Sequence, residues 1–339
     1  MRNPQRFFRP SRVISCVLLV SLSLTLLTFL EVTPTNGQTA PSVPVWNEYI
    51  ANLPAPHPGC FVANYPNEVW QETQCGPAPT EPMTVGKGND WAAQTPGPFI
   101  GKMEGAFIPS GVTSEKVGTQ FNSYSIQLNS NAPFPTSWGG KATTGWVQFI
   151  YLNRVAPSPS KGEVYIEYWL LRYHATYGNC PSGVPTKGAT NWITSSADCY
   201  FNTAMKATPF MKVTKLLYQK FYAYANFKGS GLDEAMFCFT AVTNTCYKHS
   251  EKDTLLSLSK HWTWSEFNIL GNCCASEAIF NKGASIVVSD ILYDQAGNPM
   301  ITPSCLTPSG WVTAETNNLN LGTCSGVAGS NNILFTESD

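Results

Sequence analysis

The feature that most constrains this chain is a series of short segments after Gly86 in which apolar and polar residues alternate. Gly, Pro, Asn and Ser separate these segments, and such a pattern is typical of strands joined by turns. One stretch, 209–227, fits either a short helix or a pair of strands. The expected strands are 101–108, 123–128, 146–152, 163–173, 235–242, 265–270, 285–292 and 333–336. The pattern predicts an all-β fold in which antiparallel strands form a sandwich.

The charge of the chain excludes several classes of protein. Charged residues make up 13% of the sequence, against about 25% in an average protein, and the formal net charge is −1. A nucleic-acid-binding surface needs clustered positive charge, and a disordered chain has few apolar residues, whereas 43% of this chain is hydrophobic. We therefore expect a folded, nearly neutral protein without a nucleic-acid partner. We also expect it to be a monomer.

The first 37 residues have the pattern of a secretion signal. Four arginines lie among the first twelve residues, an apolar stretch follows over 13–30, and a polar segment leads to Gly37. The alternative is an uncleaved anchor, because about 20 apolar residues span a bilayer. We expect cleavage near Gly37 or Ala40, which makes the mature protein secreted and extracellular, without stable insertion in a membrane.

Cysteine usage agrees with export. Of the 11 cysteines, Cys16 lies in the apolar segment, and the remaining even number favours disulfides in an exported protein. The sequence leaves the connectivity open, but three local pairs would each close a loop or hairpin: Cys60 with Cys75, Cys180 with Cys199, and Cys238 with Cys246. Cys273 and Cys274 are adjacent, and the four histidines lack zinc-ligand spacing. We expect no metal and no cofactor.

Residues 38–85 are rich in proline, which fixes φ and removes a backbone donor. We expect a Pro-rich N-terminal arm here, in the form of an extended segment, a small disulfide hook or a propeptide, outside the interior of any sheet. The sandwich domain is then 86–339.

Alternation along three of the expected strands gathers polar and aromatic side chains on one face, because successive residues of a strand point to opposite sides. The residues concerned are Trp146 and Gln148, then Glu163, Glu167 and Trp169, then Trp264, Glu266 and Asn268. If the strands share a sheet, this face is an aromatic-walled cleft. Each polar residue alone would be ordinary on the solvent side of a half-buried strand, but several exposed tryptophans together are typical of clefts that hold peptide or sugar.

Four segments resemble successive strands of the glutamic peptidases known as eqolisins: 145–150 (GWVQFI), 163–169 (EVYIEYW), 264–270 (WSEFNIL) and 278–288 (AIFNKGASIVV). The resemblance covers roughly 89–290 and implies a concanavalin-like β-sandwich. It departs from the family at 124–129, which lacks a Trp and two Gly, and at 178–206, which looks like an insertion. The segments 315–321 and 335–338 instead resemble a group of secreted microbial proteins of unknown function.

Carried over residue by residue, the resemblance implies a catalytic dyad of Gln148 and Glu266, with Glu167 as a supporting partner and Glu163 near the glutamine. It also places Tyr124, Trp146, Trp169, Trp264 and Asn268 at the substrate.

The implied chemistry is reasonable on general grounds. A carboxylate can take a proton from water that attacks a peptide carbonyl, and an amide can donate to the developing oxyanion. Neighbouring carboxylates raise the pKa of such a base and favour acidic medium. The first hypothesis is a secreted acid endopeptidase acting on polypeptide. The alternatives are a sandwich that binds or cleaves polysaccharide, and a non-catalytic secreted module of the same fold.

Overall fold

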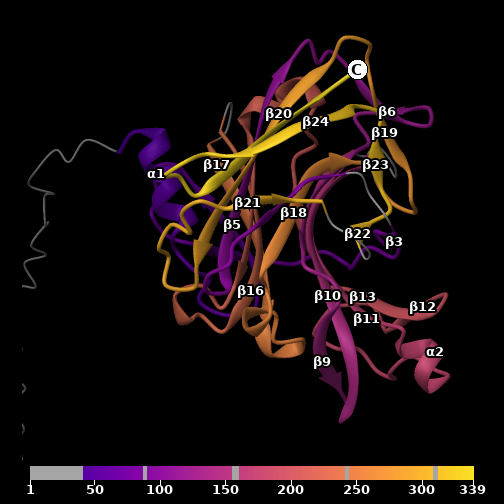
Figure 1. Ribbon diagram of the computed structural model, residues 1–339. Helices are drawn as coiled ribbons and strands as arrows, with labels where there is room; N and C mark the ends of the chain where they lie inside the picture. The colour runs from indigo at the N-terminus through magenta and orange to yellow at the C-terminus, as the bar shows by residue number, and fades with distance from the viewer. Residues whose placement is uncertain (1–40, 87–89, 155–159, 241–243, 308–311) are drawn as a thin grey trace, which may run out of the picture. The chain divides into compact units, whose positions relative to one another are not determined.

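Antiparallel strands dominate the computed structural model, which describes residues 41–86, 90–154, 160–240, 244–307 and 312–339 (Figure 1). The expected secretion signal, 1–37, lies outside the described residues. All eight expected strands are present, within a few residues of their expected ends. The stretch 209–227, which fitted either a helix or strands, forms the short 3-10 helix η1 (Val213–Tyr218) followed by strand β15 (Gln219–Ala225). The expected all-β, disulfide-bonded sandwich is confirmed.

The first large sheet has 9 strands. In spatial order they are β2 (Gln71–Thr73), β1 (Gly59–Asn64), β17 (Thr245–Lys252), β16 (Leu232–Phe239), β15 (Gln219–Ala225), β5 (Ile100–Ser110), β20 (Ser285–Asp294), β25 (Asn332–Ser338) and β24 (Asn320–Gly326).

The second large sheet has 10 strands and carries the residues of the implied dyad. Its main path is β12 (Ile193–Ser195), β13 (Asp198–Asn202), β11 (Lys161–Leu171), β10 (Lys141–Arg154), β8 (Ser125–Ser130), β18 (Trp264–Leu270), β4 (Ala92–Gln94) and β21 (Ser304–Leu306). Off this path, β14 (Lys206–Thr208) pairs with β11, and β9 (Phe134–Trp138) pairs with β10.

Short elements complete the fold. The small sheets join β23 (Thr316–Asn317), β19 (Glu277–Phe280), β6 (Glu115–Val117) and β7 (Gln120–Phe121), and separately β22 (Val312–Thr313) and β3 (Val85–Gly86). The helices are α1 (Val43–Ala51), α2 (Tyr173–Tyr177), η1 (Val213–Tyr218), η2 (Phe227–Gly229), η3 (Asp253–Leu255) and η4 (Leu258–Lys260). Among the described residues, no helix is long and apolar enough to cross a membrane.

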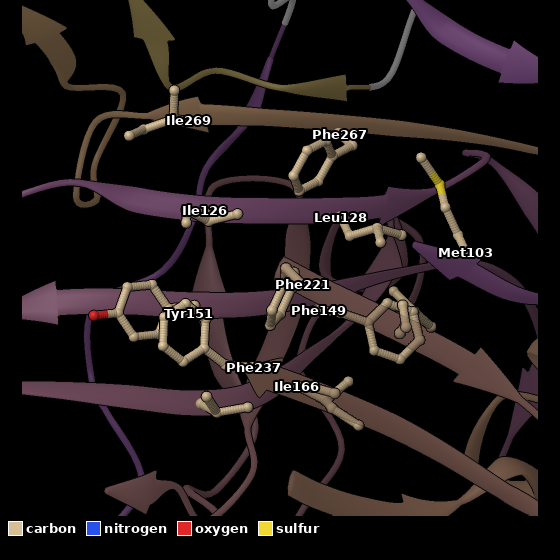
Figure 2. Close-up of a cluster of buried hydrophobic side chains, with 14 of the residues drawn as sticks. Met103, Ile126, Leu128, Phe149, Tyr151, Ile166, Phe221, Phe237, Phe267 and Ile269 are labelled. Carbon is tan, nitrogen blue, oxygen red and sulfur yellow. The ribbon is translucent and has the colours of Figure 1, made fainter. Parts of the chain in front are cut away.

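The main core lies between the two large sheets (Figure 2). Alternation on β10 turns Phe149 and Tyr151 inward, where Tyr151 stacks on Phe237 of the facing sheet with ring centroids 3.9 Å apart. Phe267 of β18 stacks in the same way on Phe107 of β5, at 4.7 Å. Such aromatic pairs add about 0.5–1.5 kcal/mol beyond the area they bury. Val147 of β10 and Ile269 of β18 lie in the same core, and the residues that alternate with these core side chains point away from it.

At Gly105 of β5 the backbone packs directly against Phe267 of the other sheet. A Cβ atom there would lie 2.2 Å from Cε2 of Phe267. We expect Gly105→Ala to lower the free energy of unfolding by about 1–3 kcal/mol, the usual cost of overpacking. Gly97→Ala is the control, since its Cβ would have no neighbour within 4 Å, and it should change stability by less than about 1 kcal/mol. Urea unfolding measures both, and equal stability of the two variants would contradict this packing.

The segment expected to be an arm outside the sheets is built into the fold. Strand β1 lies between β2 and β17, inside the 9-stranded sheet, so the expectation that this segment avoids sheet interiors was wrong. Its alternating residues Phe61 and Ala63 are fully buried, which the proline content did not reveal. Helix α1 buries Trp46 and Ile50, one turn apart, in a cluster with Tyr222 and other side chains of β15 and β16.

Five disulfides join the ten cysteines beyond the apolar segment. The three local pairs suggested by the sequence are present, and the remaining cysteines pair as Cys273 with Cys274 and Cys305 with Cys324. The Cys60–Cys75 bridge connects β1 to the chain that follows β2, at the start of the segment that reaches the second sheet.

Candidate functional site

A row of five polar side chains crosses the 10-stranded sheet. The strand register aligns Asn202, Glu167, Gln148, Asn129 and Glu266, from β13, β11, β10, β8 and β18 in turn. Their sequence neighbours, such as Phe149 and Phe267, lie in the main core, so this polar row lies on the sheet's outer face, which points away from the 9-stranded sheet. The face expected from alternation therefore exists, and it carries Gln148, Glu167 and Glu266 together.

Gln148 and Glu266 are linked indirectly. They lie two strands apart, which places their backbones about 10 Å from each other. Between them, Gln127 Oε1 accepts hydrogen bonds from Gln148 Nε2 (3.2 Å) and Asn129 Nδ2 (3.3 Å). Asn129 Nδ2 also donates to Glu266 Oε2 at 3.1 Å. A chain of amide groups thus connects the two residues of the implied dyad.

The orientation of the Gln148 amide is set by Trp169. The indole Nε1 donates to Gln148 Oε1 (2.9 Å) and to Glu167 Oε1 (2.8 Å). Because Oε1 accepts from the indole, Nε2 is turned toward Gln127 and the row. An amide nitrogen carries two hydrogens, and the bond to Gln127 uses one of them. Gln148 is therefore a fixed, fully buried amide with one N–H of Nε2 committed to Gln127.

Glu266 is a buried carboxyl with one free oxygen. Its side chain is 1% exposed, and among the described residues Oε1 has no hydrogen-bond donor. Burial raises the pKa of Glu266 well above its ordinary value, and the neighbouring carboxyl of Asp90 raises it further, while the bond from Asn129 lowers it. A carboxyl group with a raised pKa keeps its proton over a wider pH range. It can act as a base only if its surroundings change or if a neighbouring group takes that proton.

Glu167 binds a segment from elsewhere in the chain. The backbone N–H of Met83 donates to both carboxyl oxygens, at 3.1 and 3.3 Å. Burial raises the pKa of Glu167, the bond from Trp169 lowers it, and nearby Glu315 raises it. Glu167 thus supports Trp169 and Met83, and through Trp169 it helps to fix Gln148.

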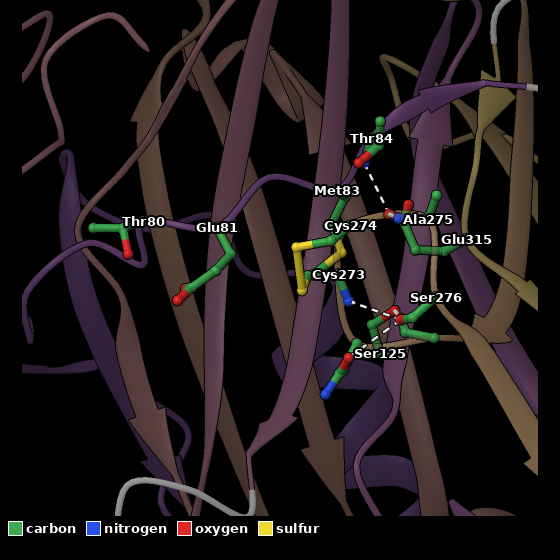
Figure 3. The surroundings of a disulfide bond; sticks show 12 residues. Thr80, Glu81, Met83, Thr84, Ser125, Cys273, Cys274, Ala275, Ser276 and Glu315 are labelled. Carbon is green, nitrogen blue, oxygen red and sulfur yellow. Dashed lines mark hydrogen bonds between the residues drawn. A yellow bond between two sulfur atoms is a disulfide. The ribbon is translucent and has the colours of Figure 1, made fainter. Parts of the chain in front are cut away.

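Residues 76–86, which we call the strap, run along the outer face in an extended form (Figure 3). The rest of the protein binds the strap mainly through its backbone. The contacts are Asn202 Nδ2 to the carbonyls of Pro79 and Glu81 (3.1 Å each), Tyr200 OH to the carbonyl of Thr80 (2.9 Å), Cys274 N to the carbonyl of Pro82 (3.2 Å), Thr84 N to Glu315 Oε1 (2.9 Å) and Ala314 N to the carbonyl of Thr84 (2.7 Å). Recognition of this kind depends little on the sequence of the bound segment.

The strap also fills apolar pockets on the outer face. Met83 is fully buried in a cluster with Ile150, Leu152, Tyr165 and Met205. Val85 packs against a second cluster that contains Trp146 and Trp169. The strap then ends in β3, which pairs with β22. In this conformation the polar row is closed to solvent.

The tryptophans of this face are not exposed. Trp146 and Trp169 are both 0% exposed, and only Trp264 is half-buried. The expectation of several exposed tryptophans was wrong because strand alternation identifies a face without showing what covers it. The rings of Trp146 and Trp169 lie 6.2 Å apart beneath the strap.

Two further expected residues lie apart from the dyad, and a third lies near Glu266 with its amide already bonded. Tyr124 is in the main core, where its hydroxyl donates to the Met211 carbonyl at 3.1 Å, a position that does not fit contact with substrate. Glu163 lies four residues from Glu167 and forms ion pairs with Arg154 and Lys161, so it does not support Gln148. Asn268 is on the outer face, but it donates to carboxyl groups.

The comparisons with known proteins give only distant similarities. No protein-family model and no curated protein matches the chain. Two solved structures of scytalido-glutamic peptidase, one with a peptide-based transition state analogue and one with a transition state analogue inhibitor, are 11% and 10% identical, with TM-scores of 0.33 and 0.31. Each comparison covers 74% of this chain and 98% of the peptidase chain. Similarity this low establishes neither family membership nor activity.

Alternation could have identified two further polar residues of the outer face that the sequence analysis missed. Applied to 125–130, it places Gln127 and Asn129 on one face of β8, between the strands of Gln148 and Glu266. Nothing in the local sequence marks Met83 or Asp90, because their roles depend on strands far away in the chain.

One group of side chains has the spacing of metal ligands within the described part of the chain. The possible ligand atoms of Cys60, Cys75 and His249 lie within 4.8 Å of one another. The two cysteines form a disulfide with each other, and a metal ligand must be a thiolate. This group does not bind a metal while the disulfide is intact.

Proposed function

We propose that this protein is a secreted, acid-acting endopeptidase of the glutamic type, and that the strap keeps it latent. The observation that carries the proposal is that the outer face holds Gln148 and Glu266 in one row and already binds an extended polypeptide segment through its backbone. A face that binds main-chain groups in this way suits a peptide better than a sugar, which has no backbone amides.

In the proposed reaction, the Glu266 carboxylate takes a proton from a water molecule whose oxygen attacks the peptide carbonyl carbon. The carbonyl oxygen becomes negative and accepts a hydrogen bond from the Gln148 amide. Glu266 then returns the proton to the leaving nitrogen as the C–N bond breaks. The products are a carboxylic acid and an amine, and Glu266 is again ionised.

The test compares variants on a denatured protein substrate from about pH 2 to 7, a range that brackets the ordinary Glu pKa of ~4.3. We expect acid proteolysis from the protein, and more from a variant with a weakened strap. Glu266→Gln should lower kcat by about 10²–10⁴ and Gln148→Ala by about 10²–10³. Glu277→Gln and Gln71→Ala, at exposed positions of other sheets, should leave activity unchanged.

Two outcomes would contradict the peptidase proposal. One is cleavage that persists at the parent rate in Glu266→Gln and Gln148→Ala. The other is a lack of cleavage at every pH by both the parent and a strap-weakened variant that remains folded. The second outcome would favour a non-catalytic module in which the strap is only structural.

Secretion is part of the proposal, and the five disulfides support it, because such bonds persist in oxidising compartments. Expression of the full chain in a secreting host should release protein whose N-terminus begins after Gly37 or Ala40. Intact chain retained in the cell membrane would contradict it.

A further inference from the structure

Asp90 lies beside Glu266 on the outer face. Strand β4 pairs with β18 so that Ala92 is opposite Glu266. Continued by two residues, this register places Asp90 opposite Asn268 and diagonal to Glu266, within reach of its carboxyl group. The two carboxyl groups are close enough to form a hydrogen bond with each other. Both side chains are buried, with exposures of 4% for Asp90 and 1% for Glu266.

The hydrogen bonds of the two carboxyl groups follow the same pattern. Asp90 Oδ1 accepts from the Asn268 amide, and Glu266 Oε2 accepts from the Asn129 amide. The other oxygen of each group, Asp90 Oδ2 and Glu266 Oε1, makes no hydrogen bond among the described residues, although the backbone N–H of Thr313 lies near the Glu266 carboxyl. Buried polar atoms are rarely left without a partner, and one proton between these oxygens would satisfy both.

The surroundings of the pair contain further acids and no paired cation. Glu337 of β25 lies within hydrogen-bonding reach of Asp90 as well, and Asn268 Nδ2 donates to Glu337 Oε1 at 2.8 Å. Asp290 of β20 is buried nearby. Among the described residues, no Lys, Arg or His forms an ion pair with any of these four carboxyl groups. Two buried carboxylates in contact cannot both remain ionised without a counter-charge.

We propose that Asp90 and Glu266 share one proton, held between Asp90 Oδ2 and Glu266 Oε1, and that Asp90 acts as a positioning residue for proton transfer by Glu266. The first part stands on the strand register, the burial and the unpartnered oxygens of the two groups, and the second rests on the proposed peptidase function. Burial raises the pKa of Asp90 to about 6 and raises that of Glu266 further from its ordinary value, in agreement with a pair that retains a proton above the range of ordinary carboxyls.

A shared proton changes what Glu266 can do. At rest the higher pKa of Glu266 places the single proton on Glu266 and the negative charge on Asp90. Transfer of this proton to Asp90 within the pair leaves Glu266 ionised, and the pair can then act as a base. It accepts a second proton from the attacking water as the oxygen–carbon bond forms, and it gives one proton to the leaving nitrogen as the C–N bond breaks. The pair then again holds one proton, so a buried glutamate can act as a base although its surroundings disfavour a bare charge.

The first test measures how many protons the folded chain holds, and it requires no activity. Each proton that the folded state binds in excess of the unfolded state makes the unfolding equilibrium constant rise about tenfold per pH unit. We expect Asp90→Asn to reduce this dependence by about one proton between about pH 4.5 and 6, because the new amide donates to the Glu266 carboxylate. Asp339→Asn, at an exposed site, should match the parent, and equal slopes for all three proteins would overturn the proposal.

The second test is the pH profile of kcat/KM for peptide cleavage. Asp90→Asn should move the acid limb to lower pH, since Glu266 then ionises more readily, whereas a merely structural role would lower the rate without moving the limb. If the protein proves inactive, this readout is lost, but the proton count still decides whether the pair shares a proton.

A third measurement covers the case in which Asp90→Asn does not fold. The carbon-13 chemical shifts of the side-chain carboxyl groups can be followed against pH in the unaltered protein. The signal that is missing from the spectrum of Glu266→Gln is the signal of Glu266. A shared proton predicts that the Asp90 and Glu266 signals titrate together in two separated steps. Independent single steps at ordinary pKa values would overturn the proposal.

Discussion

Raising the pH from about 4.5 to about 7 should lower the free energy of unfolding by several kcal/mol. The cause is a set of buried carboxyl groups whose pKa values folding raises, chiefly through burial. They are Asp90, Glu115, Glu167, Asp233, Glu266, Asp290, Glu315 and Glu337. In the folded state each group holds its proton at a pH where the unfolded chain releases it, so ionisation favours unfolding.

Glu115 shows the sign and the size of the effect. It is fully buried, and burial raises its pKa to about 8 from the ordinary 4.5. Its contribution to stability is complete below about pH 4.5 and is lost as the pH rises toward 8. At about 1.4 kcal/mol per pH unit, this one group accounts for about 3 kcal/mol between pH 4.5 and 7.

The measurement is urea unfolding at a series of pH values. Glu115→Gln should flatten the dependence by about one proton, whereas Glu277→Gln, at an exposed position, should leave it unchanged. Stability that stays constant or rises from pH 4.5 to 7 would contradict the prediction. The expected direction also agrees with a protein that works in acidic medium.

Met83→Ala should loosen the strap and increase peptide cleavage. The substitution removes a fully buried side chain from its pocket on the outer face, at a cost of about 2–5 kcal/mol in stability. If about 2 kcal/mol of this loss falls on strap binding alone, the population with an open face rises about 30-fold. The initial rate on a peptide substrate should increase by about the same factor.

The matched control is Met236→Ala. Met236 is equally buried, but it lies in the cluster beneath α1, on the other sheet. It should lower stability without raising activity. Hydrogen exchange of the 77–86 backbone amides gives a second readout, since protection there should fall in Met83→Ala alone. If both variants gain activity equally, general destabilisation explains the effect and the strap does not control access.

Local patterns predicted most of the fold. The eight expected strands and the three local disulfides follow from alternation and from cysteine spacing, which involve residues close together in the chain. The expected strand ends were wrong by a few residues where the backbone leaves the extended conformation. The strand expected over 163–173 ends at Leu171, because Arg172 adopts a φ of +58° and starts α2.

The site was predicted only in part, because local patterns do not show which distant segments come together. Alternation placed Gln148, Glu167 and Glu266 on one face, and the register of β10, β8 and β18 brings them into one row. It could not show that Tyr124 points into the core, or that the carboxyl group of Asp90 meets that of Glu266. Such contacts depend on which distant strands become neighbours.

The sequence by itself determined that the chain is a disulfide-bonded β-sandwich and which side chains share a face, because strand periodicity is a local property of the backbone. Only the tertiary structure decided that this face is closed. Met83 reaches Glu167 and Thr84 reaches Glu315 across 84 and 231 residues of sequence, and burial of this kind depends on the packing of distant segments. That packing turns an expected open cleft into a covered row with buried acids.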